Sequence, residues 1–194
     1  RYQSSSIIIA QYAGQRNTSF HRQLTKNHRE TCVRLVPRHL RTMVDSAEEA
    51  GEDVDIAVVN GPDPVVLLAG AMSFDKPLDE LKVAAALHQR IYETDLKIVE
   101  LSNGVFVPAE AEYAMEARIT GRRGEEGPYV DITGTVDDIR LEPIIEYDAI
   151  HHRNEPIFHA LIPAGVEHMT LMGMPRAPTI KTACLLYTSD AADE

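Results

Sequence analysis

The segment ETCVRLVPRHLRTMVDSAEEAG, residues 30–51, changes its hydrophobic period at Pro37. Apolar and polar residues alternate in TCVRLV (31–36), which is typical of a half-buried β-strand. Beyond the proline, apolar residues recur at the spacing of one helix face. They are Leu40, Met43, Val44 and Ala47. With Gly51 after the last of them, the segment predicts a strand followed by an amphipathic helix that has Pro37 at its first position.

The residues before this segment also have the pattern of strands. QSSSIIIA (3–10) ends in a β-branched run, AGQRN (13–17) is a turn, and TSFHRQLT (18–25) alternates. NHRE (27–30) has the composition of a hairpin turn. We therefore predict a meander of three strands over residues 3–36.

Helices dominate the next part of the chain. DIAVVNG (55–61) predicts a short buried strand, and a second helix follows over residues 64–71. A third helix is predicted over about 79–89. It has Asp79 and Glu80 in its first turn, where the helix dipole favours anions.

From residue 96 to about residue 163 the pattern is again that of extended segments separated by turns. An order of strands, helices and further strands favours an α+β domain with a largely antiparallel sheet or barrel. The sequence has neither the glycine pattern of a Rossmann dinucleotide site nor a Walker phosphate-binding loop.

Composition narrows the classes of protein. The chain has 30 acidic and 19 basic residues, a formal net charge of −11 and two cysteines. An acidic chain without a basic run argues against nucleic-acid binding, and no apolar run reaches the length of a membrane span. Cys32 is expected to be a small buried hydrophobic residue. The other cysteine, Cys184, lies near the C-terminus, so no disulfide framework is expected, which suits a reducing cytoplasm.

Both ends of the sequence are unusual. The chain starts at Arg1 without a methionine, which suggests a fragment that lacks its natural N-terminus. Residues 184–194, CLLYTSDAADE, resemble a translated sequencing adapter and are expected to be an artefactual tail outside the fold.

Two carboxylates stand on one loop, EEGPYVDITGT (125–135). Glu126 and Asp131 are separated by a Gly-Pro turn, and Gly127 is expected to be extended because a proline follows it. On composition alone the loop is either a solvated acidic loop or a site where two acids meet and their pKa values separate. Arg22 could pair with Glu126, with Asp131 or with an acidic substrate, or it could be an ordinary exposed arginine.

A metal site is a second candidate. His39 lies in the first turn of the helix after Pro37, where an anion or a metal could also bind. Asn17, His39 and Glu80 would together make a mixed nitrogen and oxygen site suited to Mg²⁺ or Mn²⁺. Their spacing does not require them to converge, and an exposed histidine is the alternative.

Five features occur in an order that resembles one known family. They are NTSFHR (17–22), VPRHL (36–40), LLAGAM (67–72), Glu80 and EGPYVD (126–131). The order and spacing resemble the UbiD family of decarboxylases, which use prenylated FMN. The resemblance implies an α+β fold with a flavin-reductase-like split β-barrel and flanking helices over residues 1–165. It also implies that residues 166–183 begin a linker or C-terminal domain that mediates dimerisation in relatives.

The resemblance assigns ligands to two ions and to the cofactor. Asn17, His39 and Glu80 would hold Mn²⁺ or Mg²⁺ against the cofactor's phosphate. A nearby K⁺ would lie at Thr18, Ala69, Gly70 and Met72, although Gly70 replaces a serine of some relatives. The implied cofactor contacts are Asn17, Ser19, Phe20, Arg22, Arg38, His39, Ala69, Met72 and Glu80.

The resemblance also implies a catalytic network of Glu126, Arg22 and Asp131, in which Asp131 departs from the commoner glutamate. Asp131 is then the expected proton donor after CO₂ leaves. The substrate would be a small carboxylic acid, such as anhydromevalonate phosphate, a polyprenyl-hydroxybenzoate or another aromatic acid. A flavin prenyltransferase would supply the cofactor, and the protein would form a homo-oligomer. The alternatives are a flavin-binding module without turnover and a plain FMN reductase.

Overall fold

The computed structural model describes residues 1–72, 78–178, 180–181 and 184. Residues 185–194, which make up nearly all of the expected artefactual tail, lie outside this range. No helix in the described ranges is long and apolar enough to cross a membrane.

An eight-stranded sheet is the centre of the molecule. Its order is β1 (Tyr2–Gln3), β4 (Gln23–Thr25), β5 (Glu30–Val33), β12 (Arg140–His152), β9 (Tyr113–Glu126), β6 (Val54–Asn60), β2 (Ile7–Tyr12) and β3 (Gln15–Phe20). Every neighbouring pair in this order is antiparallel. The prediction of a largely antiparallel sheet in an α+β domain is therefore confirmed.

The sheet is strongly curled. Strands β3 and β4 lie at or next to opposite ends of the strand order, yet only His21 and Arg22 separate them in sequence. Three residue steps reach about 11 Å, whereas the six strand spacings from β4 to β3 in a flat sheet would span about 29 Å. The two edges must therefore approach each other. The described residues form no β3–β4 ladder, so the result is a curled open sheet and not a closed barrel.

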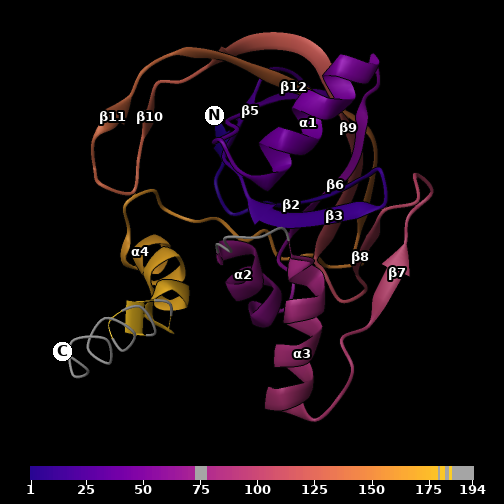
Figure 1. Ribbon diagram of the computed structural model, residues 1–194, viewed down its shortest axis with the longest axis vertical. Helices are drawn as coiled ribbons and strands as arrows, with labels where there is room; N and C mark the ends of the chain where they lie inside the picture. Colours follow the sequence, from indigo (N-terminus) through magenta and orange to yellow (C-terminus); the bar gives the residue numbers. More distant parts are fainter. Residues whose placement is uncertain (73–77, 179, 182–183, 185–194) are drawn as a thin grey trace, which may run out of the picture.

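Helices cover both faces of the central strands (Figure 1). Helix α1 (His39–Ala50) covers one face, where it shares a core with Ile8 of β2. Helices α2 (Pro64–Ala71) and α3 (Glu80–Tyr92) cover the other face, where they share a core with Ile7. Consecutive residues of β2 thus enter different cores, because side chains alternate across a strand. This explains why the strand has an unbroken apolar run instead of an alternating pattern.

Helix α1 confirms the helix predicted after Pro37. Its buried side chains are Leu40, Met43, Val44 and Ala47. Gly51 ends it in the left-handed conformation with φ of 72°, which glycine adopts at little cost. The predicted first residue was wrong, because Arg38 is extended and acts as the N-cap. His39 is therefore the first helical residue.

The other predicted helices are also found. Helix α2 has the predicted bounds, and α3 runs three residues further than expected, to Tyr92. Asp79 is the N-cap of α3 and accepts hydrogen bonds from the backbone N–H of Leu81 and Lys82. Only Glu80 of the two predicted acids is therefore in the first helical turn.

Two strand predictions need correction. Residues 18–25 are not one strand, because the chain leaves β3 at Phe20 and crosses to β4. The predicted meander is instead a β2–β3 hairpin and a β4–β5 hairpin at different edges. Residues 154–163 form no strand, and Asn60 holds this segment by exchanging hydrogen bonds with the backbone of His159.

The remaining elements lie around the sheet. Two small hairpins are formed by β7 (Ile98–Glu100) with β8 (Phe106–Pro108), and by β10 (Tyr129–Val130) with β11 (Val136–Asp137). Helix α4 (Val166–Gly173) lies beside α2 and runs into a 3₁₀ turn, η1 (Met174–Arg176). Cys32 is fully buried, as predicted.

The α1 core gives a stability prediction. Met43 is 4% exposed and packs in the core between α1 and the sheet. Met43→Ala should lower the free energy of unfolding by about 2–5 kcal/mol, since the cavity is only partly refilled. Ser46→Ala, on the exposed face of α1, should change it by less than about 0.5 kcal/mol. Urea titration of both variants measures the difference, and equal midpoints would contradict the packing described.

Candidate active site

Two clefts meet at the curled end of the sheet. The cofactor cleft has a volume of about 630 Å³, and its walls include Asn17, Ser19, His39, Met72 and Glu80. The acid cleft has a volume of about 230 Å³, and its walls include Arg22 and Asp131. The third predicted catalytic residue, Glu126, does not line it. The residues common to both walls are Phe20, His21, Val36, Arg38 and Met172. The clefts are therefore neighbouring parts of one site.

Asn17 and Glu80 meet at the floor of the cofactor cleft. Asn17 Nδ2 donates to Glu80 Oε1 at 3.1 Å, and the backbone N–H of Thr18 donates to Glu80 Oε2 at 2.8 Å. Both side chains are buried, Asn17 at 3% and Glu80 at 7% exposed. Burial raises the pKa of Glu80 above its ordinary value, as expected for a carboxyl removed from water.

His39 lies on the wall of the same cleft. Its Nε2 is 3.1 Å from Gln15 Oε1, and its Nδ1 is buried without a hydrogen-bond partner in the described structure. Burial lowers the pKa of His39, which favours the neutral imidazole that metals bind. The structure thus brings Asn17, His39 and Glu80 to one cleft, although it shows no direct contact of His39 with the other two.

These three residues fit a divalent cation in chemical type. The described residues contain no cluster of three or more His, Cys, Asp or Glu side chains arranged to hold a metal, so the amide of Asn17 is needed to complete the set. His39 Nδ1 has no partner among the described residues, and Glu80 on the same cleft is a buried carboxyl, so a divalent cation bound there would find both an imidazole nitrogen and a carboxylate oxygen. The assignment of these side chains to a metal stays a prediction.

The four residues predicted near K⁺ are only partly brought together. Gly70 and Met72 line the cofactor cleft, whereas Ala69 does not, and its carbonyl already accepts from the Met72 N–H at 3.1 Å. Thr18 Oγ1 is buried without a partner among the described residues. A side chain at position 70 would have its Cβ 3.2 Å from Ile7 Cδ1, so the core beneath α2 favours glycine there.

Arg22 and Glu126 form a bidentate ion pair. Arg22 Nε and Nη2 donate to the two carboxylate oxygens of Glu126 at 2.9 and 3.1 Å. Glu126 is fully buried at the end of β9, and the Arg22 side chain is 11% exposed. Of the partners considered for Arg22 from the sequence, Glu126 is the one that the structure shows. Glu126 is therefore not part of a solvated loop.

The second acid bound by Arg22 is Asp137 and not Asp131. Arg22 Nη2 donates to Asp137 Oδ2 at 2.6 Å, which holds the pKa of Asp137 below its usual range. The ring of Tyr129 lies under the guanidinium, 4.4 Å from Cζ. Sequence reasoning missed Asp137. The signal was the ITGT turn, since a hairpin there pairs Asp137 with Tyr129.

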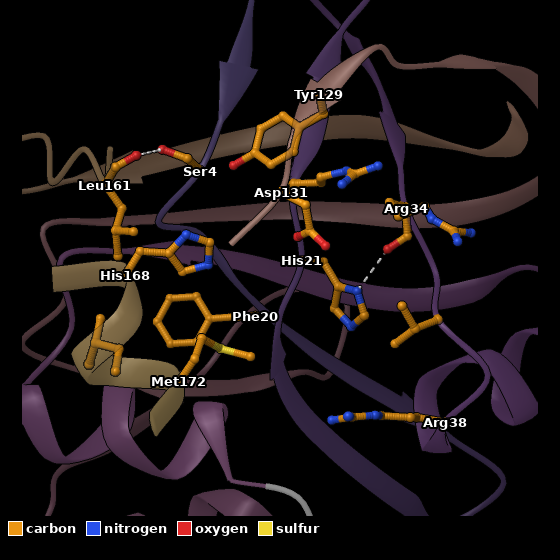
Figure 2. A pocket seen from close by; sticks show the side chains of 13 residues that line it. Ser4, Phe20, His21, Arg34, Arg38, Tyr129, Asp131, Leu161, His168 and Met172 are labelled. Carbon is orange, nitrogen blue, oxygen red and sulfur yellow. Dashed lines mark hydrogen bonds between the residues drawn. The ribbon is translucent and has the colours of Figure 1, made fainter. Parts of the chain in front are cut away.

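Asp131 lines the acid cleft from the turn that follows β10. Its backbone N–H donates to the Thr135 carbonyl at 2.8 Å, but its carboxylate makes no hydrogen bond to a described residue. Figure 2 shows this carboxylate and the imidazole of His168 facing the same space. Burial lowers the pKa of His168, and the charge of Asp131 opposes that shift.

The Gly-Pro turn differs from the prediction in one respect. Gly127 has φ of 113°, outside the ordinary extended region expected before a proline. A Cβ at this position would lie 2.8 Å from the carbonyl oxygen of Asp138. Glycine is therefore required both by the backbone conformation and by the close approach of the β10–β11 hairpin.

His21 is a second residue that sequence reasoning did not select. It lines both clefts and is 8% exposed, and burial lowers its pKa to about 4. Its Nδ1 is 3.0 Å from the Arg34 carbonyl oxygen and its Nε2 is 2.9 Å from Ser19 Oγ. Ser19, Phe20 and Arg38 line the clefts as predicted for cofactor contacts. The only available signal was the position of His21 inside the NTSFHR motif.

Comparison with known proteins identifies the family. Residues 1–166 match the model of the UbiD family, described as the 3-octaprenyl-4-hydroxybenzoate carboxy-lyase Rift-related domain. The chain belongs to the UbiD family. The match covers the whole curled sheet and every cleft-lining residue except those of α4, His168, Leu171 and Met172.

Named relatives of this UbiD chain are decarboxylases. The anhydromevalonate phosphate decarboxylase of Methanocaldococcus jannaschii is 44% identical over 164 residues, which are 84% of this chain and 38% of that protein. The phenolic acid decarboxylase of Escherichia coli O157:H7 is 32% identical over 150 residues, 76% of this chain and 31% of that protein.

A solved UbiD-class enzyme has the same fold. HmfF from Pelotomaculum thermopropionicum in complex with FMN superposes with a TM-score of 0.85 at 35% identity, over 90% of this chain and 39% of that one. An evolved dimeric form of HmfF in complex with prFMN superposes equally well. The chain spans about two fifths of the length of the anhydromevalonate phosphate decarboxylases that it matches.

The buried ion pair gives a prediction for the UbiD chain. Arg22→Met should lower the free energy of unfolding by about 3–5 kcal/mol, because it leaves Glu126 charged and unpaired in the interior. Arg22→Met combined with Glu126→Leu should recover most of that loss. Urea titration of the single and double variants tests this, and a double variant less stable than Arg22→Met would contradict it.

The buried imidazole of His21 gives a pH prediction. Its pKa of about 4 in the fold is below the unfolded value of 6.5, so the unfolded chain binds a proton first as pH falls. This contribution to stability is complete above pH 6.5 and is lost towards pH 4. Relative to pH 8, it should amount to about 2 kcal/mol lost at pH 5. His21→Gln should lose correspondingly less on acidification, and identical pH profiles from urea titrations would contradict the assignment.

Proposed function

We propose that the protein catalyses the reversible, non-oxidative decarboxylation of an α,β-unsaturated or aromatic carboxylic acid with prenylated FMN. The observation that carries the proposal is the meeting of two residue sets in adjoining clefts. Asn17, His39 and Glu80 lie in one cleft, and Arg22 and Asp131 line the other, with Glu126 behind Arg22. Mere cofactor binding would need only the first set.

The cofactor cleft would hold the flavin phosphate at its deep end. Asn17, His39 and Glu80 would bind a Mn²⁺ or Mg²⁺ that contacts the phosphate, and a K⁺ near Thr18 and Met72 is part of the same proposal. Prenylated FMN supplies, when bound, the electron sink that loss of CO₂ requires. The polypeptide orients the substrate, excludes water and delivers the proton.

Arg22 is placed to hold the substrate carboxylate. Its Nε and Nη2 are occupied by Glu126 and Asp137, while Nη1 makes no hydrogen bond to a described residue. Glu126 and Asp137 fix the plane of the guanidinium, since a bidentate pair restricts the arginine to one orientation. The stacked ring of Tyr129 restrains it further. Nη1 can then meet the substrate carboxylate from a fixed position.

Asp131 is the proposed proton donor. Glu126 is fully buried and both of its oxygens accept from Arg22, so it has no free oxygen to turn towards a substrate. The carboxylate of Asp131 lines the acid cleft without a hydrogen bond to a described residue. General acid catalysis requires such a group within hydrogen-bond reach of the carbon that takes the proton.

Anhydromevalonate phosphate is our first candidate for the substrate. Five relatives with this activity in their names are 37–44% identical to the chain. Arg22, Arg34 and Arg38 line the acid cleft, which suits a substrate with more than one anionic group. A polyprenyl-hydroxybenzoate or another aromatic acid is the alternative within the same reaction class.

The proposal has further parts that depend on the whole protein. A flavin prenyltransferase would supply the cofactor, and the enzyme would work as a homo-oligomer in the cytoplasm. Residues 1–165 would form a flavin-reductase-like split-barrel domain, with a C-terminal domain beginning at residue 166. The curled open sheet supports the split-barrel assignment, and the dimeric form of HmfF supports the homo-oligomer.

Two other functions are separated by one comparison. A flavin-binding module without turnover would bind the cofactor but release no CO₂, and an FMN reductase would work with ordinary FMN. Neither has a use for an acid facing the cleft. CO₂ release from the candidate acids only after loading with prenylated FMN supports the decarboxylase, while activity with FMN and a nicotinamide would contradict it.

The proton-donor assignment predicts the effect of one substitution. Asp131→Asn in protein loaded with prenylated FMN should lower kcat about 10²–10⁴-fold with little change in KM, because the general acid is lost. Asp138→Asn, an exposed aspartate of the same hairpin, is the matched control and should keep the wild-type kcat. Rates of CO₂ release measure both variants. Wild-type turnover by Asp131→Asn would overturn the assignment.

A further inference from the structure

Four side chains form a line of hydrogen bonds from Glu80 to His21. Asn17, Ser19 and His21 are alternate residues, so they project from the same side of the chain as it leaves β3. Asn17 Nδ2 donates to Glu80 at 3.1 Å, and Ser19 Oγ lies 2.6 Å from Asn17 Oδ1 and 2.9 Å from His21 Nε2. The line ends at the Arg34 carbonyl oxygen, 3.0 Å from His21 Nδ1.

This line of hydrogen bonds has one donor hydrogen fewer than its acceptors require. A carbonyl oxygen only accepts, so His21 Nδ1 carries the hydrogen and Nε2 of the neutral ring is an acceptor. Asn17 Oδ1 is also an acceptor. The single Ser19 hydroxyl hydrogen lies between these two acceptors and can serve only one of them. In this arrangement either Asn17 or His21 keeps a buried lone pair without a donor, which is unfavourable.

Turning the Asn17 amide over removes the mismatch. Nδ2 would then donate to Ser19 Oγ, and the Ser19 hydroxyl would be free to donate to His21 Nε2. The same rotation points Oδ1 at Glu80 Oε1, so that two oxygens face each other. Two acceptors facing each other repel unless a cation lies between them, and amide and carboxylate oxygens are ligands that Mn²⁺ and Mg²⁺ accept.

We propose that His21 is a positioning residue that acts through Ser19 to turn the Asn17 amide oxygen towards a divalent cation at Glu80. The proposal rests on the metal site of the proposed function. Without the cation, the bond from Nδ2 to Glu80 holds the amide in the orientation seen. With the cation, the hydrogen bond gained between Ser19 and His21 favours the turned orientation and strengthens metal binding.

The test is Mn²⁺ binding, measured by titration calorimetry with FMN present. His21→Phe removes the acceptor and keeps a ring of similar size. It should weaken Mn²⁺ binding about tenfold, in keeping with the loss of one buried hydrogen bond. His21→Gln retains an oxygen that can accept from Ser19 and should stay within about threefold of the unmodified protein. His28→Phe, at an exposed histidine, is the matched control and should bind as the unmodified protein does.

A double-mutant cycle separates this role from a general loss of structure. In a Ser19→Ala background, His21→Phe should change Mn²⁺ affinity by less than about twofold, because the two residues act through one line of bonds. A purely structural role would weaken binding in both backgrounds. Ser19→Ala removes one oxygen only and should by itself weaken binding about tenfold, which keeps the test decisive should His21→Phe not fold.

The outcomes also distinguish failure of the metal site from failure of the positioning role of His21. If the unmodified protein binds no Mn²⁺ with FMN present, the metal site and the positioning role are both overturned. If it binds Mn²⁺ and the Ser19→Ala or His21→Phe variant binds equally well, only the positioning role is overturned. Equal weakening by His21→Phe and His21→Gln would also overturn it, since the acceptor would then be irrelevant.

Discussion

The two-residue link between β3 and β4 determines both the curl of the sheet and the place of the site. His21 and Arg22 join β3, at one end of the eight-strand order, to β4, next to the other end, so the sheet has to curl until its edges approach. The same link places its own side chains where the edges meet. His21 enters the wall common to both clefts, and Arg22 reaches the end of β9 to bind Glu126. Fold and site therefore have one origin.

Much of this architecture could be predicted from local pattern. The four buried residues of α1 and the bounds of α2 follow from helical spacing and from the Pro and Gly at their ends. The break at His21 could not be predicted, because alternation continues through residues 18–25 while the chain changes edges. Long-range pairing decides it. The contact of Arg22 with Asp137 could not be predicted for the same reason. Asp137 reaches Arg22 because the β10–β11 hairpin pairs it with Tyr129.

The candidate site was predictable where the order of several motifs resembles a known family, and less so where a role depends on a particular hydrogen bond. The resemblance to the UbiD family selected Asn17, His39 and Glu80, which do share one cleft. It did not select His21, whose importance lies in the direction of its hydrogen bonds. It also placed Glu126 and Asp131 in one network with Arg22, with Asp131 as the expected proton donor. The structure separates them into a buried anchor for Arg22 and an acid that faces the cleft.

One cofactor bound across both clefts, with its metal at Asn17 and Glu80 and its ring near the shared wall at Phe20 and His21, would join the two residue sets into one active site. A crystal structure with prenylated FMN and Mn²⁺, with anomalous scattering recorded at the manganese edge, tests this most directly. We expect a single anomalous peak within coordination distance of Asn17 Oδ1, Glu80 and His39, and a flavin ring that borders the acid cleft. A peak away from these side chains, or a flavin outside the two clefts, would contradict it.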